Sequence, residues 1–258
     1  MVNGADVVLD VRDIGVRFGG LVALSQVSLM VRRHEVLGLI GPNGAGKSTF
    51  INAVTGLYRI TSGEVRLEDR RIDGLDSRAI AVAGVSRTFQ NLRLFRSMTV
   101  LDNVLTGFHA GTRSGFIRCM LGAPRQRREE AFTRAAALEL LEKLDLAEHK
   151  DHLVGSLPYA QQKAVELCRA LALTPKLLLL DEPSGGMSLA ERKHLRNTIQ
   201  ALAKEGMTVL LIEHDVQLVM DTCHRIAVMD QGRKIADGSP EAIRNDEKVI
   251  AAYLGQED

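Results

Sequence analysis

Two long stretches near the start of the chain alternate apolar and polar residues. Val7–Phe18 and Leu24–Arg33 follow this pattern and are rich in β-branched residues, and Gly19-Gly20 stands between them. A period of two is typical of a strand with one buried face, and a glycine pair accommodates a tight turn. The pattern therefore predicts an antiparallel pair of strands in this part of the chain.

Short, unbroken apolar runs recur further along, and such runs are typical of strands buried on both faces. They lie at Val36–Ile40, Leu177–Leu180, Val209–Ile212 and Ile226–Met229, and shorter strands are expected at Val65–Leu67 and Val85–Phe89. Segments with helical spacing come between them, near Lys47–Thr55, Ala160–Leu173, Ser188–Lys204 and Val216–Asp221. Strands that alternate with helices predict an α/β fold with a mainly parallel sheet and right-handed crossovers.

A helical period dominates from Thr99 to about Leu144, interrupted by the Gly- and Arg-rich stretch Ala110–Arg128. The chain has no internal repeat, no low-complexity segment and no linker. We therefore expect residues 1–258 to form a single domain, with a helical subdomain inserted at approximately 91–170.

The composition narrows the class of protein. Of the 258 residues, 45% are hydrophobic and 25% are charged, as in ordinary folded domains. Lys and Arg number 33 against 32 for Asp and Glu, so no basic field favours nucleic acid. Cys119, Cys168 and Cys223 lie far apart, which argues against a disulfide framework or a zinc site and suits a reducing cytosol.

Neither a signal peptide nor a membrane span is predicted. The first residues, Met-Val-Asn-Gly-Ala-Asp, include an acid where a signal peptide needs a base. No apolar run reaches the roughly 18 residues that a membrane-spanning helix requires. We expect the chain by itself to stay in the cytosol.

A phosphate-binding motif follows the first buried strand. The eight residues from Gly41 to Ser48 have the spacing G-x-x-x-x-G-K-S, between a predicted strand and a predicted helix. Glycines let successive N–H groups turn around phosphates at a helix N-terminus. Lys47 would neutralise the β- and γ-phosphate oxygens, and Ser48 would supply an oxygen ligand to Mg²⁺. The alternative is a glycine-rich turn with an exposed lysine. The expected nucleotide-binding residues are Gly41, Pro42, Asn43, Gly44, Ala45, Gly46, Lys47, Ser48 and Thr49.

An acidic pair ends the strand of four leucines. Asp181 and Glu182 directly follow Leu177–Leu180, and open α/β sheets bind ligands at the carboxyl ends of their strands. Asp181 would hold Mg²⁺ through a water molecule, and Glu182 would be the general base for the water that attacks the γ-phosphate. The alternative is that the pair only caps the next helix.

These motifs together resemble the ATP-binding subunit of ABC transporters, and the resemblance covers nearly the whole chain. It implies a P-loop NTPase cassette with an N-terminal antiparallel β subdomain and an inserted α-helical subdomain, and it implies ATP and Mg²⁺ as cofactors. Gln90 matches the family's glutamine that touches Mg²⁺ or the attacking water. His214 matches the histidine that bonds the γ-phosphate. Phe18 matches the aromatic residue that stacks on adenine, for which an ordinary core position is the alternative.

The signature segment departs from the family pattern. Most members have Leu-Ser-Gly-Gly-Gln where this chain has Leu157, Pro158, Tyr159, Ala160 and Gln161. The resemblance implies that this segment binds, in trans, the ATP of a second subunit in a head-to-tail pair. The Ala160 methyl replaces a glycine, so we expect backbone strain and a changed rate at that composite site.

The loop after Glu182 departs from the family as well. Ser188 stands where most members have aspartate, and Ser188 with Glu191 predicts a capping box for the next helix. A structural role explains the serine adequately.

Other stretches resemble the ATPase subunits of branched-chain amino-acid importers in particular: Asn91–Phe95, Ala110–Arg128 and Val249–Gly255. Leu92, Leu94 and Phe95 are either core residues or an exposed groove for a permease helix. The resemblance implies as partners a second ABC ATPase, two membrane permeases and, indirectly, a periplasmic binding protein, with no nucleic acid. It also implies a peripheral location on the cytoplasmic face of the inner membrane.

Other functions stay open at this point. The altered signature is compatible with an ATP-gated clamp that hydrolyses little. Urea, amide and lipopolysaccharide systems use similar ATPases. An ABC protein of repair or translation is disfavoured, because those usually carry two cassettes or a coiled-coil insert. A signalling GTPase is disfavoured because the chain lacks the guanine-binding motif Asn-Lys-x-Asp.

Overall fold

The computed structural model describes residues 6–109 and 124–254, which form two compact units. The first unit combines the residues up to Arg87 with those from Lys176 on, and the second runs from Thr88 to Pro175. Positions 110–123, with most of the predicted Gly- and Arg-rich stretch and Cys119, lie outside the described residues.

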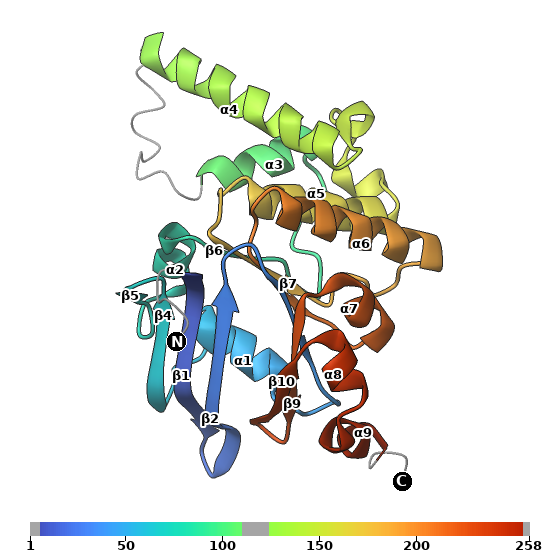
Figure 1. Ribbon diagram of the computed structural model, residues 1–258. Helices are drawn as coiled ribbons and strands as arrows, with labels where there is room; N and C mark the ends of the chain where they lie inside the picture. The colour runs from blue at the N-terminus through green and yellow to red at the C-terminus, as the bar shows by residue number, and fades with distance from the viewer. Residues whose placement is uncertain (1–5, 110–123, 255–258) are drawn as a thin grey trace. The chain divides into compact units, whose positions relative to one another are not determined.

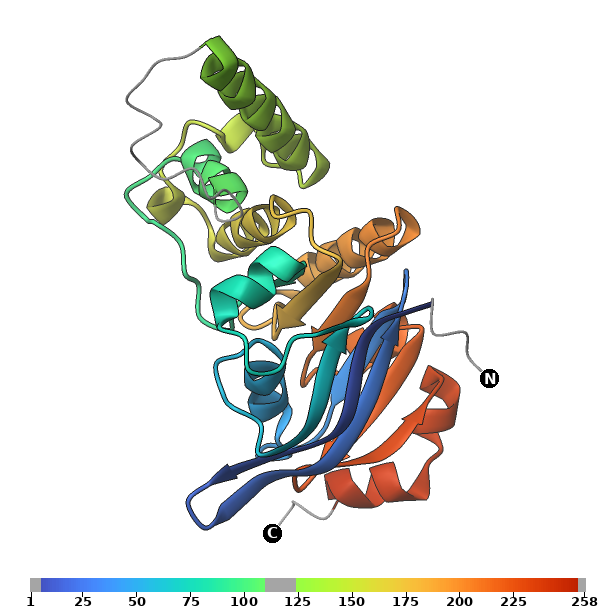
Figure 2. The same cartoon turned by 90° about the vertical axis from the view of Figure 1, so that its left-hand side faces the viewer.

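One sheet of the first unit is antiparallel, with the strand order β2-β1-β4-β5. β1 (Val7–Phe18) and β2 (Leu21–Arg32) form the predicted hairpin. β4 (Ser62–Leu67) pairs with the other side of β1, and the short β5 (Arg70–Arg71) pairs with β4. Figure 2 shows the long, twisted hairpin with β4 beside it. The alternating pattern therefore predicted this hairpin correctly.

The other sheet of the first unit has six strands in the order β10-β9-β3-β8-β7-β6 (Figure 1). All neighbours run parallel except β10, which is antiparallel to β9. The strands are β3 (Val36–Ile40), β6 (Val85–Arg87), β7 (Leu177–Asp181), β8 (Val209–Ile212), β9 (Arg225–Asp230) and β10 (Arg233–Gly238). The expected α/β fold with a mainly parallel sheet is confirmed.

Helices connect the parallel strands of the first unit. α1 (Lys47–Val54), α6 (Leu189–Lys204) and α7 (Val216–Thr222) follow β3, β7 and β8, as predicted. Three further helices come where the sequence pattern indicates none: α2 (Ser77–Ala83), α8 (Pro240–Arg244) and α9 (Glu247–Leu254). These helices have five to eight residues, so each offers too few turns for a helical period to stand out.

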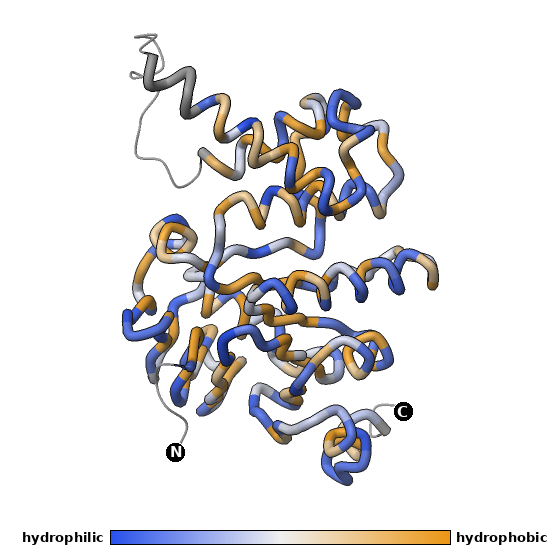
Figure 3. The backbone as a smooth tube through the Cα atoms, turned by 45° about the horizontal axis from the view of Figure 1, so that its top comes forward, coloured by the Kyte–Doolittle hydropathy of each residue, from blue (hydrophilic) through white to orange (hydrophobic). Residues whose placement is uncertain are grey.

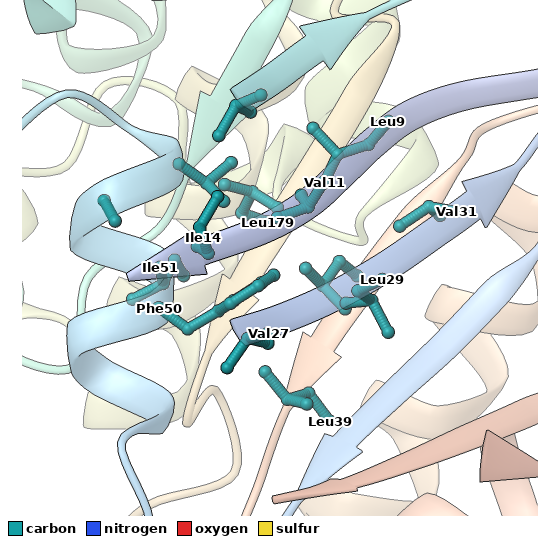
Figure 4. Packing of buried hydrophobic residues seen from close by; sticks show 14 of the residues in the cluster. Leu9, Val11, Ile14, Val27, Leu29, Val31, Leu39, Phe50, Ile51 and Leu179 are labelled. Carbon is teal, nitrogen blue, oxygen red and sulfur yellow. The ribbon is translucent and has the colours of Figure 1, made fainter. Parts of the chain in front are cut away.

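The core of the first unit joins α1 to both sheets. Phe50 and Ile51 of α1 are fully buried, and they belong to one apolar cluster with Val27 and Leu29 of β2 and Leu39 of β3 (Figure 4). Large buried apolar side chains of this kind dominate packing energy. The cluster therefore fixes the helix that begins at Lys47.

The described part of the second unit consists of helices and connecting turns. Its main helices are α3 (Val100–His109), α4 (Pro124–Lys143) and α5 (Tyr159–Leu171), with short 3₁₀ turns at Ala147–His149 and Val154–Ser156. Apolar and polar residues alternate every few positions along α3 and α5, and the coloured trace of the chain shows such alternation (Figure 3). That spacing is typical of helices with one buried face.

Candidate functional site

Three adjacent parallel strands, in the order β3-β8-β7, carry at their carboxyl ends the predicted site residues of the first unit other than Phe18, and β6 lies next to β7. Gly41 directly follows β3, and one residue separates His214 from the end of β8. Asp181 is the last residue of β7, and Glu182 comes directly after it. Arg87 ends β6. Parallel strands align their carboxyl ends along one edge of the sheet, where open α/β folds bind ligands.

The phosphate loop has the backbone shape that its glycines permit. Gly46, the N-cap of α1, has φ 99°, which is left-handed. Gly41 has φ 151°, and a Cβ there would lie 2.1 Å from the carbonyl oxygen of Met229. The Ala45 carbonyl accepts a hydrogen bond from the Gly232 N–H at 3.0 Å, which ties the loop to the β9–β10 turn. Asn43, Gly44 and Ser48 are exposed, whereas Pro42 and Ala45 are buried and Thr49 is half-buried.

Lys47 lies inside this loop. Its side chain is buried, and Nζ donates to the carbonyl oxygens of Gly41 at 2.5 Å and Pro42 at 2.9 Å. Burial lowers the pKa of Lys47, and the negative charge of Glu182 opposes that shift. The loop therefore holds an ammonium group beside the exposed end of α1, where phosphate oxygens can be neutralised.

Two of the three predicted metal-binding residues, Ser48 and Asp181, belong to the first unit, and the third, Gln90, belongs to the second. Asp181 is buried at the end of β7, and Ser48 is exposed in the first turn of α1. Among residues 6–109 and 124–254, no three His, Cys, Asp or Glu side chains gather into a metal site. Mg²⁺ at nucleotide sites needs only one or two protein ligands besides phosphates and water, so a hydroxyl and a carboxylate fit it.

Glu182 has an uncommon backbone conformation. Its φ is 47°, in the left-handed region that non-glycine residues rarely adopt, and its N–H donates to the Ile212 carbonyl at 2.9 Å. The His214 Nδ1 atom lies 4.0 Å from Oε2 of Glu182, and the His214 side chain is 61% exposed. The two predicted residues are therefore neighbours. Strained backbone of this kind is concentrated at functional sites.

Glu213, which is not among the predicted site residues, anchors the segment between β7 and β8. Its side chain is fully buried, and Oε1 accepts from the Ser184 N–H at 2.8 Å, while Oε2 lies 3.8 Å from Nδ1 of His214. A charged residue between a buried strand and a histidine was the signal that could have revealed it. Glu213 thus links the loop after Glu182 to His214.

The capping box predicted at Ser188 is confirmed. The Ser188 hydroxyl accepts from the Glu191 N–H, and the Glu191 carboxylate accepts from the Ser188 N–H at 2.7 Å. Hydrogen bonds from Ser188 lower the pKa of Glu191. The serine therefore has the structural role that its sequence context indicates.

Phe18 is not a core residue, so that alternative is wrong. Its side chain is 46% exposed, and its ring meets the ring of Tyr58, itself 39% exposed. Tyr58 is not among the predicted site residues, because nothing in the local pattern distinguishes it from a tyrosine in a loop. The pair forms an exposed aromatic surface in the first unit.

The signature residues lie in the second unit. Leu157 is buried, Pro158 is the N-cap of α5, and Tyr159 is 44% exposed in the first turn. Ala160 is helical and is not among the residues with positive φ, so the strain expected there is absent. An alanine in a right-handed helix is unstrained. The side-chain nitrogen of Gln161 lies 3.0 Å from Nε2 of His149.

Gln90 also belongs to the second unit and not to the one that holds the phosphate loop. β6 ends at Arg87, before the predicted Phe89, and the segment beyond it is tied to α5. The Lys163 Nζ atom of α5 donates to the Gln90 carbonyl at 3.0 Å. Gln90 is therefore anchored by the helix that carries the signature.

Phe95 is exposed, so the core alternative is wrong for this residue. Its side chain is 53% exposed, whereas Leu92 and Leu94 are half-buried. Asn103, fully buried, accepts from the Phe95 N–H at 2.9 Å and donates to its carbonyl at 3.0 Å. These two hydrogen bonds to the backbone hold Phe95 at the surface of the second unit.

None of the helices in the described ranges combines the length and the apolar character of a membrane span.

Comparison with known proteins identifies relatives along nearly the whole chain. Residues 24–185 match the family described as "ABC transporter", and residues 233–258 match the one described as "Branched-chain amino acid ATP-binding cassette transporter". The high-affinity branched-chain amino acid transport ATP-binding proteins LivG of Salmonella typhimurium and BraF of Pseudomonas aeruginosa are 43% and 42% identical, over 96% of this chain and 98% of each relative.

Solved structures that resemble this chain are also ATP-binding cassettes of ABC transporters. A nucleotide-free ATP-binding cassette from an ABC transporter superposes with a TM-score of 0.84 at 33% identity, covering 97% of this chain and 100% of that one. The ADP conformation of MJ1267, also an ATP-binding cassette of an ABC transporter, gives 0.83 at 31% identity, covering 97% and 99%.

Proposed function

This chain belongs to the ABC transporter family, and we propose that it binds and hydrolyses ATP as a subunit of an importer for branched-chain amino acids. The observation that carries the proposal is the row of strand ends described above. Three adjacent parallel strands present a phosphate loop, a histidine and an acidic pair along one edge of a sheet. ATP hydrolysis needs these groups together, to bind phosphates, hold a metal and activate water.

The binding roles follow from position. Phe18 supplies an exposed ring for adenine, and the residues from Gly41 to Thr49 surround the phosphates with N–H groups and the Lys47 ammonium. Ser48 and Asp181 provide the oxygens that fit Mg²⁺, with Asp181 acting through water. When bound, Mg²⁺ neutralises phosphate charge.

Glu182 takes the proton of the attacking water, and His214 donates a hydrogen bond toward the γ-phosphate. Their 4.0 Å separation supports a joint action on one small region. The role proposed for Gln90 of the second unit is a contact with Mg²⁺ or with the attacking water.

A second ABC ATPase completes the site. In the proposed head-to-tail pair, residues Leu157–Gln161 bind the partner's ATP through the N-terminus of α5. Two membrane permeases dock on the helical unit, with Phe95 as one exposed apolar contact, and a periplasmic binding protein delivers the substrate to them. The assembly lies on the cytoplasmic face of the inner membrane. Nucleic acid has no role.

The test has two stages. The purified chain is first assayed for ATP binding and for hydrolysis in single and multiple turnover, with Lys47→Ala as the control that loses phosphate affinity. ATP binding without single-turnover hydrolysis would support the clamp instead. The chain is then reconstituted with candidate membrane permeases, and uptake of leucine is compared with that of urea. Leucine uptake that requires intact Glu182 supports the proposal, and urea uptake alone overturns its substrate.

A further inference from the structure

Arg87 connects the proposed metal-binding carboxylate to the phosphate-loop helix. One guanidinium nitrogen, Nη2, donates to Oδ2 of Asp181 at 2.7 Å. The other, Nη1, donates to Oδ1 of Asn52 at 2.7 Å and to Oγ1 of Thr55 at 3.3 Å. One planar group therefore spans the end of β7 and the end of α1.

This bridge is buried. The side chains of Arg87 and Asp181 are only 10% and 9% exposed. A buried, charge-assisted hydrogen bond fixes the orientation of both groups far better than an exposed pair does. Arginine is suited to the position because its rigid fork directs separate donors at partners on two elements, whereas a lysine ammonium is a compact point charge on a flexible stem.

The two proposed Mg²⁺ ligands of the first unit lie on elements that Arg87 holds. Asp181 is its direct partner, and Ser48 stands on α1 one helical turn before Asn52, so the two lie on the same side of the helix. We propose that Arg87 is a positioning residue that sets the spacing between Ser48 and Asp181, and thereby the affinity of the nucleotide site for Mg²⁺. The inference rests on the proposed function.

Loss of Arg87 has two opposing effects on Mg²⁺. Removal of one positive charge strengthens the attraction between a dication and the site. Removal of the fork lets the buried carboxylate turn and lets α1 shift against β7. Mg²⁺ demands near-ideal octahedral geometry, and loss of a group that orients a ligand typically lowers metal affinity about 10–100-fold. We therefore expect orientation to dominate.

The test replaces Arg87 with methionine, which keeps an unbranched apolar stem and removes the charge and the donors. ATP binding and hydrolysis by the full chain are measured while the Mg²⁺ concentration is varied at fixed ATP. The expected result is a half-saturating Mg²⁺ concentration about 10-fold above that of the wild type. In Arg87→Lys, which keeps the charge, part of this shift is recovered.

A matched control separates positioning from stability. Arg225 forms a similar buried pair with Glu35, at 2.8 Å, with side chains 16% and 8% exposed. It lies at the start of β9, beside the start of β3, at the edge of the sheet opposite the phosphate loop. Arg225→Met and Arg87→Met should both lower the melting temperature, but only Arg87→Met should change the Mg²⁺ requirement.

A double substitution tests the route of the effect. If Arg87 acts through Asp181, then Arg87→Met in an Asp181→Asn background raises the half-saturating Mg²⁺ concentration little beyond Asp181→Asn alone. Additive effects, an unchanged Mg²⁺ requirement or a lower one would each overturn the inference. A wild-type chain that binds no ATP would instead overturn the proposed function, so the two failures are distinguishable.

Discussion

The rings of Phe18 and Tyr58 meet edge to face, with centroids 5.0 Å apart and planes at 80°. Phe18 ends β1, and Tyr58 follows α1, so the contact joins the antiparallel sheet to the helix of the phosphate loop. Edge-to-face contacts of this kind restrict ring motion. Tyr58 therefore holds the Phe18 ring, which remains 46% exposed.

We expect Phe18→Ala to weaken ATP binding about 10-fold, because stacking of a base on an aromatic ring is typically worth about 1–3 kcal/mol. Tyr58→Ala should weaken it less, since the Phe18 ring remains but loses its support. Titration calorimetry measures both. Tyr58→Phe keeps the ring and should bind like the wild type, and a loss of affinity in that control would mean that the tyrosine hydroxyl matters instead.

Replacement of Glu182 with glutamine should preserve ATP binding and lower the steady-state rate of hydrolysis about 10²–10⁴-fold, since the amide is nearly isosteric but cannot accept a proton as a base. Binding and phosphate release are measured on the same preparation. Lys47→Ala is the contrasting variant, because it should lose affinity itself. Turnover unchanged by Glu182→Gln would show that another group activates the water.

Glu166 on α5 is a buried carboxylate that the proposed mechanism does not use. Glu166 is 1% exposed, its Oε1 atom accepts a hydrogen bond from the Arg93 N–H at 3.4 Å, and its Oε2 atom has no hydrogen-bond partner. Burial raises the pKa of Glu166 above its ordinary value of 4.5, and the Arg93 N–H and the charges of Lys163 and Arg169 oppose that shift.

The raised pKa of Glu166 determines how this residue makes the stability of the fold depend on pH. Between its ordinary and its raised pKa, Glu166 keeps a proton in the folded protein that the unfolded chain releases, so stability falls as pH rises through that window. Glu166→Gln is neutral throughout. We expect it to be about 1 kcal/mol more stable than the wild type at pH 8, with the difference vanishing toward pH 4. Thermal unfolding at several pH values measures this.

Glu191→Gln is a control, because the stability contribution of Glu191 should depend on pH in the opposite direction to that of Glu166. Because hydrogen bonds from Ser188 lower the pKa of Glu191 below 4.5, its stabilising contribution is present above pH 4.5 and is lost as the pH falls through its folded pKa. This variant should therefore be less stable than the wild type at neutral pH only. Parallel pH profiles for the two variants would contradict the interpretation.

Tyr253 of α9 borders a cavity of about 310 Å³ whose other walls include Ile40, Met220, Ile243 and Val249. Its buried hydroxyl makes no well-formed hydrogen bond, and burial raises the pKa of Tyr253 to about 12, while the nearby Gly41 backbone opposes that shift. We expect Tyr253→Phe to change the free energy of unfolding by less than about 1 kcal/mol, because it removes an unsatisfied polar group. Tyr253→Ala should cost about 2 kcal/mol through lost packing. A large loss in the phenylalanine variant, measured by urea unfolding, would reveal a role for the hydroxyl.

Local sequence determined the elements that carry the chemistry. The apolar runs from Val36 and Leu177 each produced a buried strand, and the spacing of Gly41, Gly46 and Lys47 placed the start of α1. The box of Ser188 and Glu191 capped α6 as expected. These features depend on residues within a few positions of one another, so periodicity, glycine conformation and capping are enough to predict them.

Only the tertiary structure decided which distant groups meet. The placement of β8 between β3 and β7 brings His214 within 4.0 Å of Glu182, and the pairing of β6 with β7 brings Arg87 to Asp181, 94 positions away in the chain. It also turned Phe18 outward against Tyr58 and left Ala160 unstrained within α5. Strand order and side-chain contacts result from the packing of whole elements into a shared core, and no local pattern of residues records how distant elements pack.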